Sequence, residues 1–183
     1  MDRRAFLAGA SALTAASAAR AQTPPAGGAE AALREASARA GANHRSLLLV
    51  FHASWCLYCR LFDMLLKHND AAPIIGRYFE ILQLRAQERR APMQEQQLPG
   101  ADEVYHRYAP EGAGLPYLVV LGDGSKKISD SIMVASGENF GFPVEPVELD
   151  GFEAMLKAGA PTISHGELAT LRRVCKALIK EKG

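Results

Sequence analysis

The sequence predicts an α/β fold: a three-layer sandwich with a mixed central sheet and a C-terminal helical extension. Apolar runs typical of buried strands alternate with helical patterns, an Asp-Gly turn separates two later apolar runs, and the chain closes with helical segments. Strand, helix and strand in succession imply parallel pairing with a crossover. The later hairpin adds an antiparallel pair, which makes the predicted sheet mixed.

The composition is that of an ordinary globular protein. Of the 183 residues, 48% are hydrophobic and 22% are charged, which argues against a largely disordered chain. The length suffices for one compact domain with additional segments. The formal net charge is +1 and lacks the basic excess typical of nucleic-acid-binding proteins, so we expect no nucleic-acid partner.

The first residues have the pattern of an export signal. Residues 1–21 contain the pair Arg3-Arg4, a mild apolar stretch rich in Ala and Ser, and small residues at the end. This resembles a twin-arginine signal, although Asp2 stands where Ser or Thr is common, so the Sec route stays open. The alternative is a segment that stays attached. We expect a periplasmic protein without a membrane span after cleavage, because a span needs roughly 20 apolar residues.

After a Pro- and Gly-rich linker at 22–28, helices and strands alternate. Residues 30–40 are rich in Ala and precede Gly41, which favours a helix. Residues 46–53 form a nearly continuous apolar run, typical of a strand buried on both faces. From Cys56 onward, apolar residues recur with a helical period. The next predicted elements are a short helical turn at 74–79, a strand at 80–84, an exposed insert at 85–97 and a helix at 101–108.

The second half combines a hairpin with two helices. An Asp-Gly pair between two apolar runs is a strong hairpin signal. Ser164 and Glu167, three residues apart, have the pattern of a helix capping box. These signals predict strands at 116–121 and 126–132 and helices at 148–157 and 164–180.

Two of the three cysteines lie close together at the start of a predicted helix. Cys56 and Cys59 are too near each other to cross-link a loop-rich fold, so their spacing favours redox or metal chemistry. Free N–H groups and the helix dipole would stabilise a thiolate at Cys56. Because a thiolate attacks disulfides, Cys56 is the candidate nucleophile and Cys59 the candidate resolving thiol. This order of events predicts an exposed Cys56 and a half-buried Cys59.

Two segments carry a resemblance to a known family. Residues 49–59, Leu-Val-Phe-His-Ala-Ser-Trp-Cys-Leu-Tyr-Cys, resemble the active-site segment of thioredoxin-like proteins. Residues 114–121, Gly-Leu-Pro-Tyr-Leu-Val-Val-Leu, resemble the segment that carries their cis-proline. The resemblance implies a thioredoxin-like domain at 29–158, with 159–183 as the helical extension. It also implies thiol–disulfide exchange with protein thiols or disulfides as substrates, and no cofactor, since the two sulfurs carry the electrons.

The resemblance also implies roles for residues around the cysteine pair. The Leu115–Pro116 bond would be cis, an uncommon state even before proline, and its backbone would bind an extended substrate segment. Trp55 would flank the pair and offer a flat apolar surface to a partner. The pair would need a redox-recycling partner, for which a membrane-bound thiol donor is a candidate in this compartment.

Two positions depart from thioredoxin itself. Val50 stands where thioredoxins carry a buried Asp that helps to move the proton of the second cysteine. Leu57-Tyr58 replaces Gly-Pro between the cysteines. Both changes bear on the reduction potential, which spans about −270 to −120 mV in this fold, so the sequence leaves the direction of electron flow open.

Other functions stay open at this level. A copper-binding or metallochaperone protein could hold Cu(I) between the two soft sulfurs, whereas zinc would want four ligands. His52 could join such a site, but we expect it to pack. A redox-inactive interaction module with a structural disulfide is the third interpretation. We expect Cys175, among apolar residues of the last helix, to be a buried packing residue.

Overall fold

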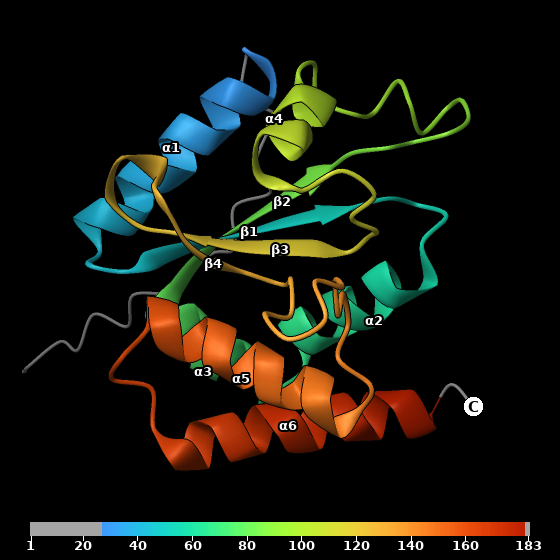
Figure 1. The fold of residues 1–183 in the computed structure, drawn as a ribbon. Coiled ribbons are helices and arrows are strands. Elements are labelled where there is room, and N and C mark those ends of the chain that lie inside the picture. Colours follow the sequence, from blue (N-terminus) through green and yellow to red (C-terminus); the bar gives the residue numbers. More distant parts are fainter. Residues whose placement is uncertain (1–26, 182–183) are drawn as a thin grey trace, which may run out of the picture.

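Four strands form the central sheet of the computed structural model, which describes residues 27–181 (Figure 1). β1 pairs in parallel with β2 and antiparallel with β3, and β3 pairs antiparallel with β4. The mixed sheet predicted from the sequence is confirmed. The strands are β1 (Ser46–His52), β2 (Phe79–Arg85), β3 (Tyr117–Leu121) and β4 (Lys127–Asp130), in the spatial order β2-β1-β3-β4.

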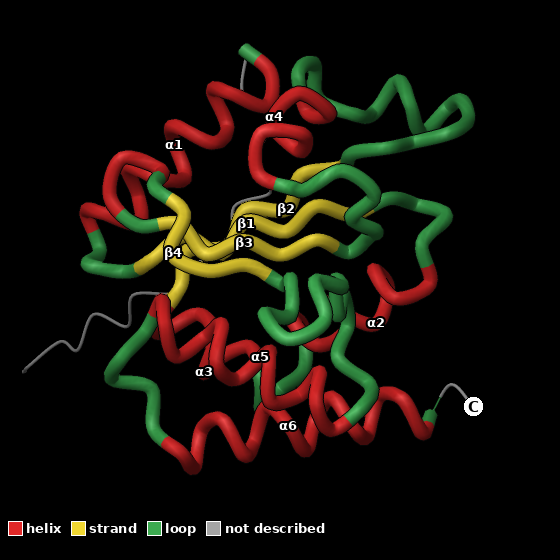
Figure 2. Tube along the Cα trace, viewed as in Figure 1, coloured by secondary structure: helices red, strands yellow, loops and turns green. Residues whose placement is uncertain are grey.

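Helices cover both faces of the sheet (Figures 1 and 2), which confirms the predicted α/β sandwich. One face carries α1 (Gly28–Ala42) and α4 (Ala101–Tyr108). The other carries α2 (Leu57–Lys67), α3 (Ala72–Tyr78), α5 (Pro146–Gly159) and α6 (His165–Lys180), with α6 outermost. A short 3-10 turn, η1 (Asp123–Ser125), joins β3 to β4.

The central strand β1 explains why its sequence is a continuous apolar run. Alternate residues of a strand point to opposite faces, and helices cover both faces here. Leu47, Leu49 and Phe51 join the cluster beneath α1 and α4. Leu48 and Val50 join the cluster beneath α2, α5 and α6. All five side chains are buried, so neither face of β1 is in contact with solvent from Leu47 to Phe51.

The last helix, α6, contributes to the same core as the helix that carries the cysteines. Leu171 and Val174 of α6 are buried in one cluster with Phe62 and Leu65 of α2. Phe62 also meets Phe152 of α5 edge to face, with ring centroids 6.3 Å apart. The C-terminal helix therefore supports α2 from the side opposite the sheet.

The start of α6 confirms the predicted capping box. The Ser164 hydroxyl accepts a hydrogen bond from the Glu167 N–H, and the Glu167 carboxylate accepts one from the Ser164 N–H. Each pairing satisfies a backbone donor that a helix start would otherwise leave free.

Several stretches differ from the sequence-based prediction, which places, for example, the helix α5 (Pro146–Gly159) at 148–157. Helix α1 begins at Gly28, inside the segment assigned to the linker. β4 ends at Asp130 instead of residue 132, because the chain then turns into an isolated bridge to the segment before α5. The insert at 85–97 is not wholly exposed: Ala86 and Glu88 are buried, and the Glu88 carboxylate is hydrogen-bonded to the loop before the cysteines.

The predicted export signal, residues 1–21, and the linker as far as residue 26 lie outside the described residues. Within residues 27–181, none of the helices has the length and apolar character to cross a membrane.

Candidate active site

The two cysteines lie at the amino end of α2 and form a disulfide, with their Cα atoms 5.3 Å apart. Cys56 is the N-cap of α2, and its Sγ accepts a hydrogen bond from the Cys59 backbone N–H at 3.1 Å. The N–H groups of a first helical turn lack helical partners and carry partial positive charge. The helix start would therefore stabilise a thiolate at Cys56 once the disulfide is reduced.

The segment before β3 forms a second wall of the site. The Leu115–Pro116 peptide bond is cis, as the resemblance implies. The carbonyl oxygen of Leu115 lies 3.3 Å from Cys56 Sγ, although the two residues are 59 positions apart in sequence. Leu115 also packs against the small cluster that contains both cysteines. The fold thus brings together the two segments that carried the resemblance.

Asn139 braces the cis-proline segment. Its side-chain amide donates to the carbonyl oxygens of Gly114, at 2.9 Å, and Pro116, at 3.0 Å. Its Oδ1 accepts from the N–H of Gly141, which has a φ of +57° and lies against Pro116. Sequence reasoning missed Asn139, because a polar residue between two elements gives no sign of the distant backbone that it will bind.

The accessibility of the cysteines differs from the prediction. An exposed Cys56 and a half-buried Cys59 are expected from sequence, yet both residues are only 5% exposed. That prediction is wrong for the disulfide form, because both cysteines pack in one cluster with Ala53 and Leu115. The neighbouring apolar side chains are the exposed ones: Trp55 by 40%, Leu57 by 52% and Tyr58 by 49%.

Trp55, immediately before the cysteine pair, is held on two sides. Its indole Nε1 donates to the carbonyl oxygen of Gln87 at 2.9 Å. The guanidinium carbon of Arg89 lies 3.8 Å from the centre of its ring, which is a cation–π arrangement. Both partners belong to the insert that follows β2. The insert therefore fixes the orientation of an aromatic ring beside Cys56.

A buried carboxylate anchors the loop just before Trp55. The side chain of Glu88 is 1% exposed. One of its oxygens accepts the Ser54 N–H and the other accepts the Ser54 hydroxyl, each at 2.7 Å. Arg85 Nε lies 3.5 Å from the first oxygen. Sequence reasoning missed Glu88, because a Glu inside a stretch rich in charge and Gln has the pattern of a solvated surface.

A cavity of about 270 Å³ lies next to the pair, and Cys59, His52, Asp63 and Arg85 are among the residues that line it. Burial lowers the pKa of His52, and Arg85 lowers it further, against the opposing charges of Asp63 and Glu88. The imidazole is therefore largely neutral at pH 7 and adds no full positive charge near Cys59. His52 is half-buried, in line with a packing residue.

The remaining cysteine lies away from the site, and the described residues contain no larger cluster of metal ligands. Cys175 is fully buried in α6, and burial raises the pKa of its thiol to about 12, which confirms the predicted packing residue. In the part of the chain that the structure describes, no group of three His, Cys, Asp or Glu side chains is arranged to hold a metal ion. The two sulfurs that Cu(I) would need are bonded to each other.

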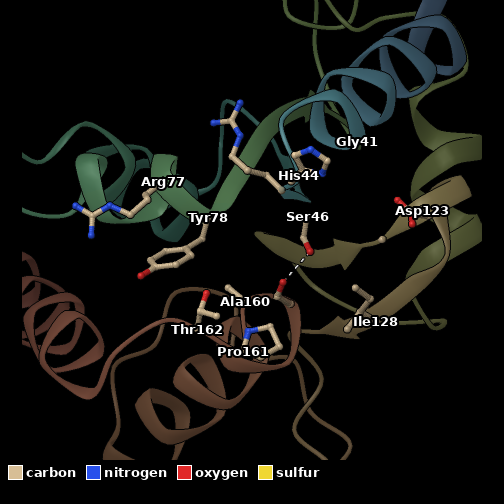
Figure 3. Close-up of a pocket in the computed structure, with 13 residues that line it drawn as sticks. Gly41, His44, Ser46, Arg77, Tyr78, Asp123, Ile128, Ala160, Pro161 and Thr162 are labelled. Atoms are coloured by element: carbon tan, nitrogen blue, oxygen red, sulfur yellow. Dashed lines mark hydrogen bonds between the residues drawn. The ribbon is translucent and has the colours of Figure 1, made fainter.

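A larger cavity, of about 480 Å³, lies at the other end of β1 (Figure 3). The Ser46 hydroxyl donates to the carbonyl oxygen of Gly159 at 2.7 Å there. The Arg45 guanidinium donates to the Gly76 carbonyl and to Glu80, both at 2.7 Å. The Ser46 hydroxyl and the two terminal nitrogens of Arg45 are thus already hydrogen-bonded, whereas Arg45 Nε is buried without a partner among the described residues. The cavity shares no lining residue with the cysteine site.

Comparison with known proteins adds a family assignment. The family described as the thioredoxin-like domain matches residues 33–130, which include both cysteines and Pro116. A disulphide isomerase from Xylella fastidiosa Temecula1 is 21% identical with a TM-score of 0.48, covering 85% of this chain and 92% of that one. A thioredoxin from Thermus thermophilus is 22% identical with a TM-score of 0.40, covering 53% and 68%. The DsbH oxidoreductase is 19% identical with a TM-score of 0.44, covering 81% and 95%. No curated protein matched the sequence.

Proposed function

The chain belongs to the thioredoxin-like domain family, and we propose that it exchanges disulfides with protein thiols in the periplasm. One observation carries this proposal. Cys56 Sγ sits at a helix start, accepts the Cys59 N–H, and lies 3.3 Å from the Leu115 carbonyl beside the cis-proline. The helix start and the Cys59 N–H favour a thiolate on Cys56, and the cis-proline segment lies next to it.

In the reducing direction, the exchange takes two steps. The Cys56 thiolate attacks one sulfur of a substrate disulfide, so a mixed disulfide forms and one substrate thiolate leaves. The Cys59 thiolate then attacks Cys56 Sγ, which forms the Cys56–Cys59 disulfide and releases the second substrate thiolate. Two electrons pass from the protein dithiol to the substrate, and the protons lost by the two cysteines return to the substrate thiolates. The same steps in reverse oxidise a substrate dithiol.

The cis-proline segment is the proposed substrate-binding element. Asn139 already occupies the carbonyl oxygens of Gly114 and Pro116, on either side of Leu115. The backbone of Leu115 is therefore the part of this segment that we assign to an extended substrate strand. Trp55, immediately before the pair in sequence, is the second proposed substrate-contacting residue, with its ring fixed and partly exposed.

The chemistry and the amino-terminal sequence support the proposed compartment and the proposed partner. Residues 1–21 resemble an export signal, and disulfide exchange suits an oxidising compartment. Each turnover leaves the cysteine pair in the opposite redox state. We therefore propose a recycling partner in or on the membrane that resets the pair by the same exchange chemistry.

We expect the purified protein to catalyse disulfide exchange in at least one direction. The reduced form should accelerate the reduction of insulin disulfides by dithiothreitol, or the oxidised form should introduce disulfides into reduced, unfolded ribonuclease. Cys175→Ala is the matched control and should keep the activity, since that thiol is buried away from the site. Absence of both activities in protein with an intact pair would contradict the proposed function.

A further inference from the structure

The insert after β2 holds Glu88 rigidly at the cysteine site. The Glu88 N–H donates to Gln97 Oε1 at 3.2 Å, and its carbonyl accepts from Gln94 Nε2 at 3.1 Å. The Gln97 amide in turn donates to Asp102 at the start of α4 at 2.8 Å. Main chain and side chain of Glu88 are thus both fixed. A buried carboxylate held in this way keeps a fixed position at the site, whereas a charged side chain on the surface would be mobile.

The same carboxylate binds the loop that leads directly to Cys56. Both of its oxygens bind Ser54, which is two residues before Cys56. Its neighbours on either side in the sequence, Gln87 and Arg89, both contact Trp55, between Ser54 and Cys56. Arg85, at 3.5 Å, is the cation that faces it.

Resting on the proposed function, we propose that Glu88 is a positioning residue that makes the Cys56–Cys59 couple more reducing. It fixes the Ser54–Trp55 turn through its two hydrogen bonds. It also places a negative charge beneath the loop that leads to Cys56. A thiolate on Cys56 is repelled by this charge, whereas the neutral disulfide is not. Destabilising the thiolate form favours the disulfide and so lowers the reduction potential.

The relevant equilibrium is exchange with glutathione. One protein disulfide and two glutathione thiols give one protein dithiol and one oxidised glutathione, with two electrons passing from glutathione to the protein and no other reactant. Glu88→Gln keeps the size of the side chain and removes its charge. We expect this variant to shift the equilibrium constant about tenfold toward the dithiol, which corresponds to about 30 mV.

Glu95→Gln is the matched control. Glu95 belongs to the same insert, is exposed, and undergoes the same loss of charge. We expect its equilibrium constant to stay within about twofold of the parent, because exposed charges are screened by water and salt. An unchanged constant in Glu88→Gln, or an equal shift in Glu95→Gln, would overturn the inference.

A second variant distinguishes the effect of the Glu88 charge from the effect of a loosened loop. It also provides a test if Glu88→Gln does not fold. Arg85→Gln removes the cation that faces the carboxylate. We expect it to shift the glutathione equilibrium severalfold toward the disulfide, opposite in sign to Glu88→Gln. Shifts of the same sign in the two variants would indicate a loosened loop and would contradict the proposed role of the charge.

The glutathione experiment distinguishes a failure of this inference from a failure of the proposed function. If the parent protein does not equilibrate with glutathione at all, the exchange function itself is wrong. If the parent equilibrates and the Glu88 variant has the same constant, the function stands and the role of Glu88 is wrong.

Discussion

Replacing Cys56 by serine is expected to lower the rate of disulfide exchange at least ~100-fold, because thiolate is the attacking species and serine cannot supply it. The Sγ atom of Cys56 accepts a hydrogen bond from the Cys59 N–H at the start of α2 and lies next to the cis-proline segment. The measurement is the initial rate of insulin reduction, or of ribonuclease oxidation, with parent and variant at equal concentration.

The Cys59→Ser variant should behave in a different way. It keeps the nucleophile and lacks the thiol that resolves the mixed disulfide, so it should accumulate covalent adducts with substrate proteins. Non-reducing electrophoresis of each variant after incubation with an oxidised substrate would show them. Adducts that form with Cys56→Ser and not with Cys59→Ser would reverse the two assigned roles.

Truncation of a single leucine in α6 is expected to destabilise the whole domain. Leu171 is fully buried in the cluster that also contains Phe62 and Leu65 of α2. Leu171→Ala should therefore lower the free energy of unfolding by about 2–5 kcal/mol, the usual cost of losing a buried leucine side chain and leaving a cavity. Urea unfolding followed by circular dichroism measures this change.

Lys176→Ala is the control within the same helix. Lys176 is exposed, so its loss should change the free energy of unfolding by no more than about 0.5 kcal/mol. If Leu171→Ala changed stability as little as the control does, α6 would be only loosely attached, and its support of the cysteine helix would be wrong.

Most of the fold was predictable because the signals are local. The apolar run of β1 reflects burial on both faces, and the Asp-Gly pair marks the hairpin between β3 and β4. Helix α4 has the bounds Ala101–Tyr108 that its sequence predicts, because Pro110 disfavours a helical conformation at the preceding residue, Ala109. The cis state of Leu115–Pro116 came from family resemblance, because no local pattern specifies it.

The polar supports of the site could not be predicted, since each depends on a distant partner. The buried carboxylate of Glu88 accepts both of its hydrogen bonds from Ser54, which lies 34 residues earlier. Asn139 binds backbone that lies 23 and 25 residues away. The low exposure of Cys56 was also not predicted. Its position at the start of a helix indicates a reactive thiol, but the sequence does not show that Leu115 packs against it.

The Cys56–Cys59 disulfide should be reduced and re-formed through attack at Cys56 while the protein stays folded. The measurement is incubation of the oxidised protein in glutathione buffers of defined ratio, followed by acid quenching, alkylation and mass spectrometry, with circular dichroism recorded in parallel. We predict reversible conversion between disulfide and dithiol, a transient glutathione adduct on Cys56, and an unchanged circular dichroism spectrum. A disulfide that persists at every ratio until the protein is unfolded would contradict the account.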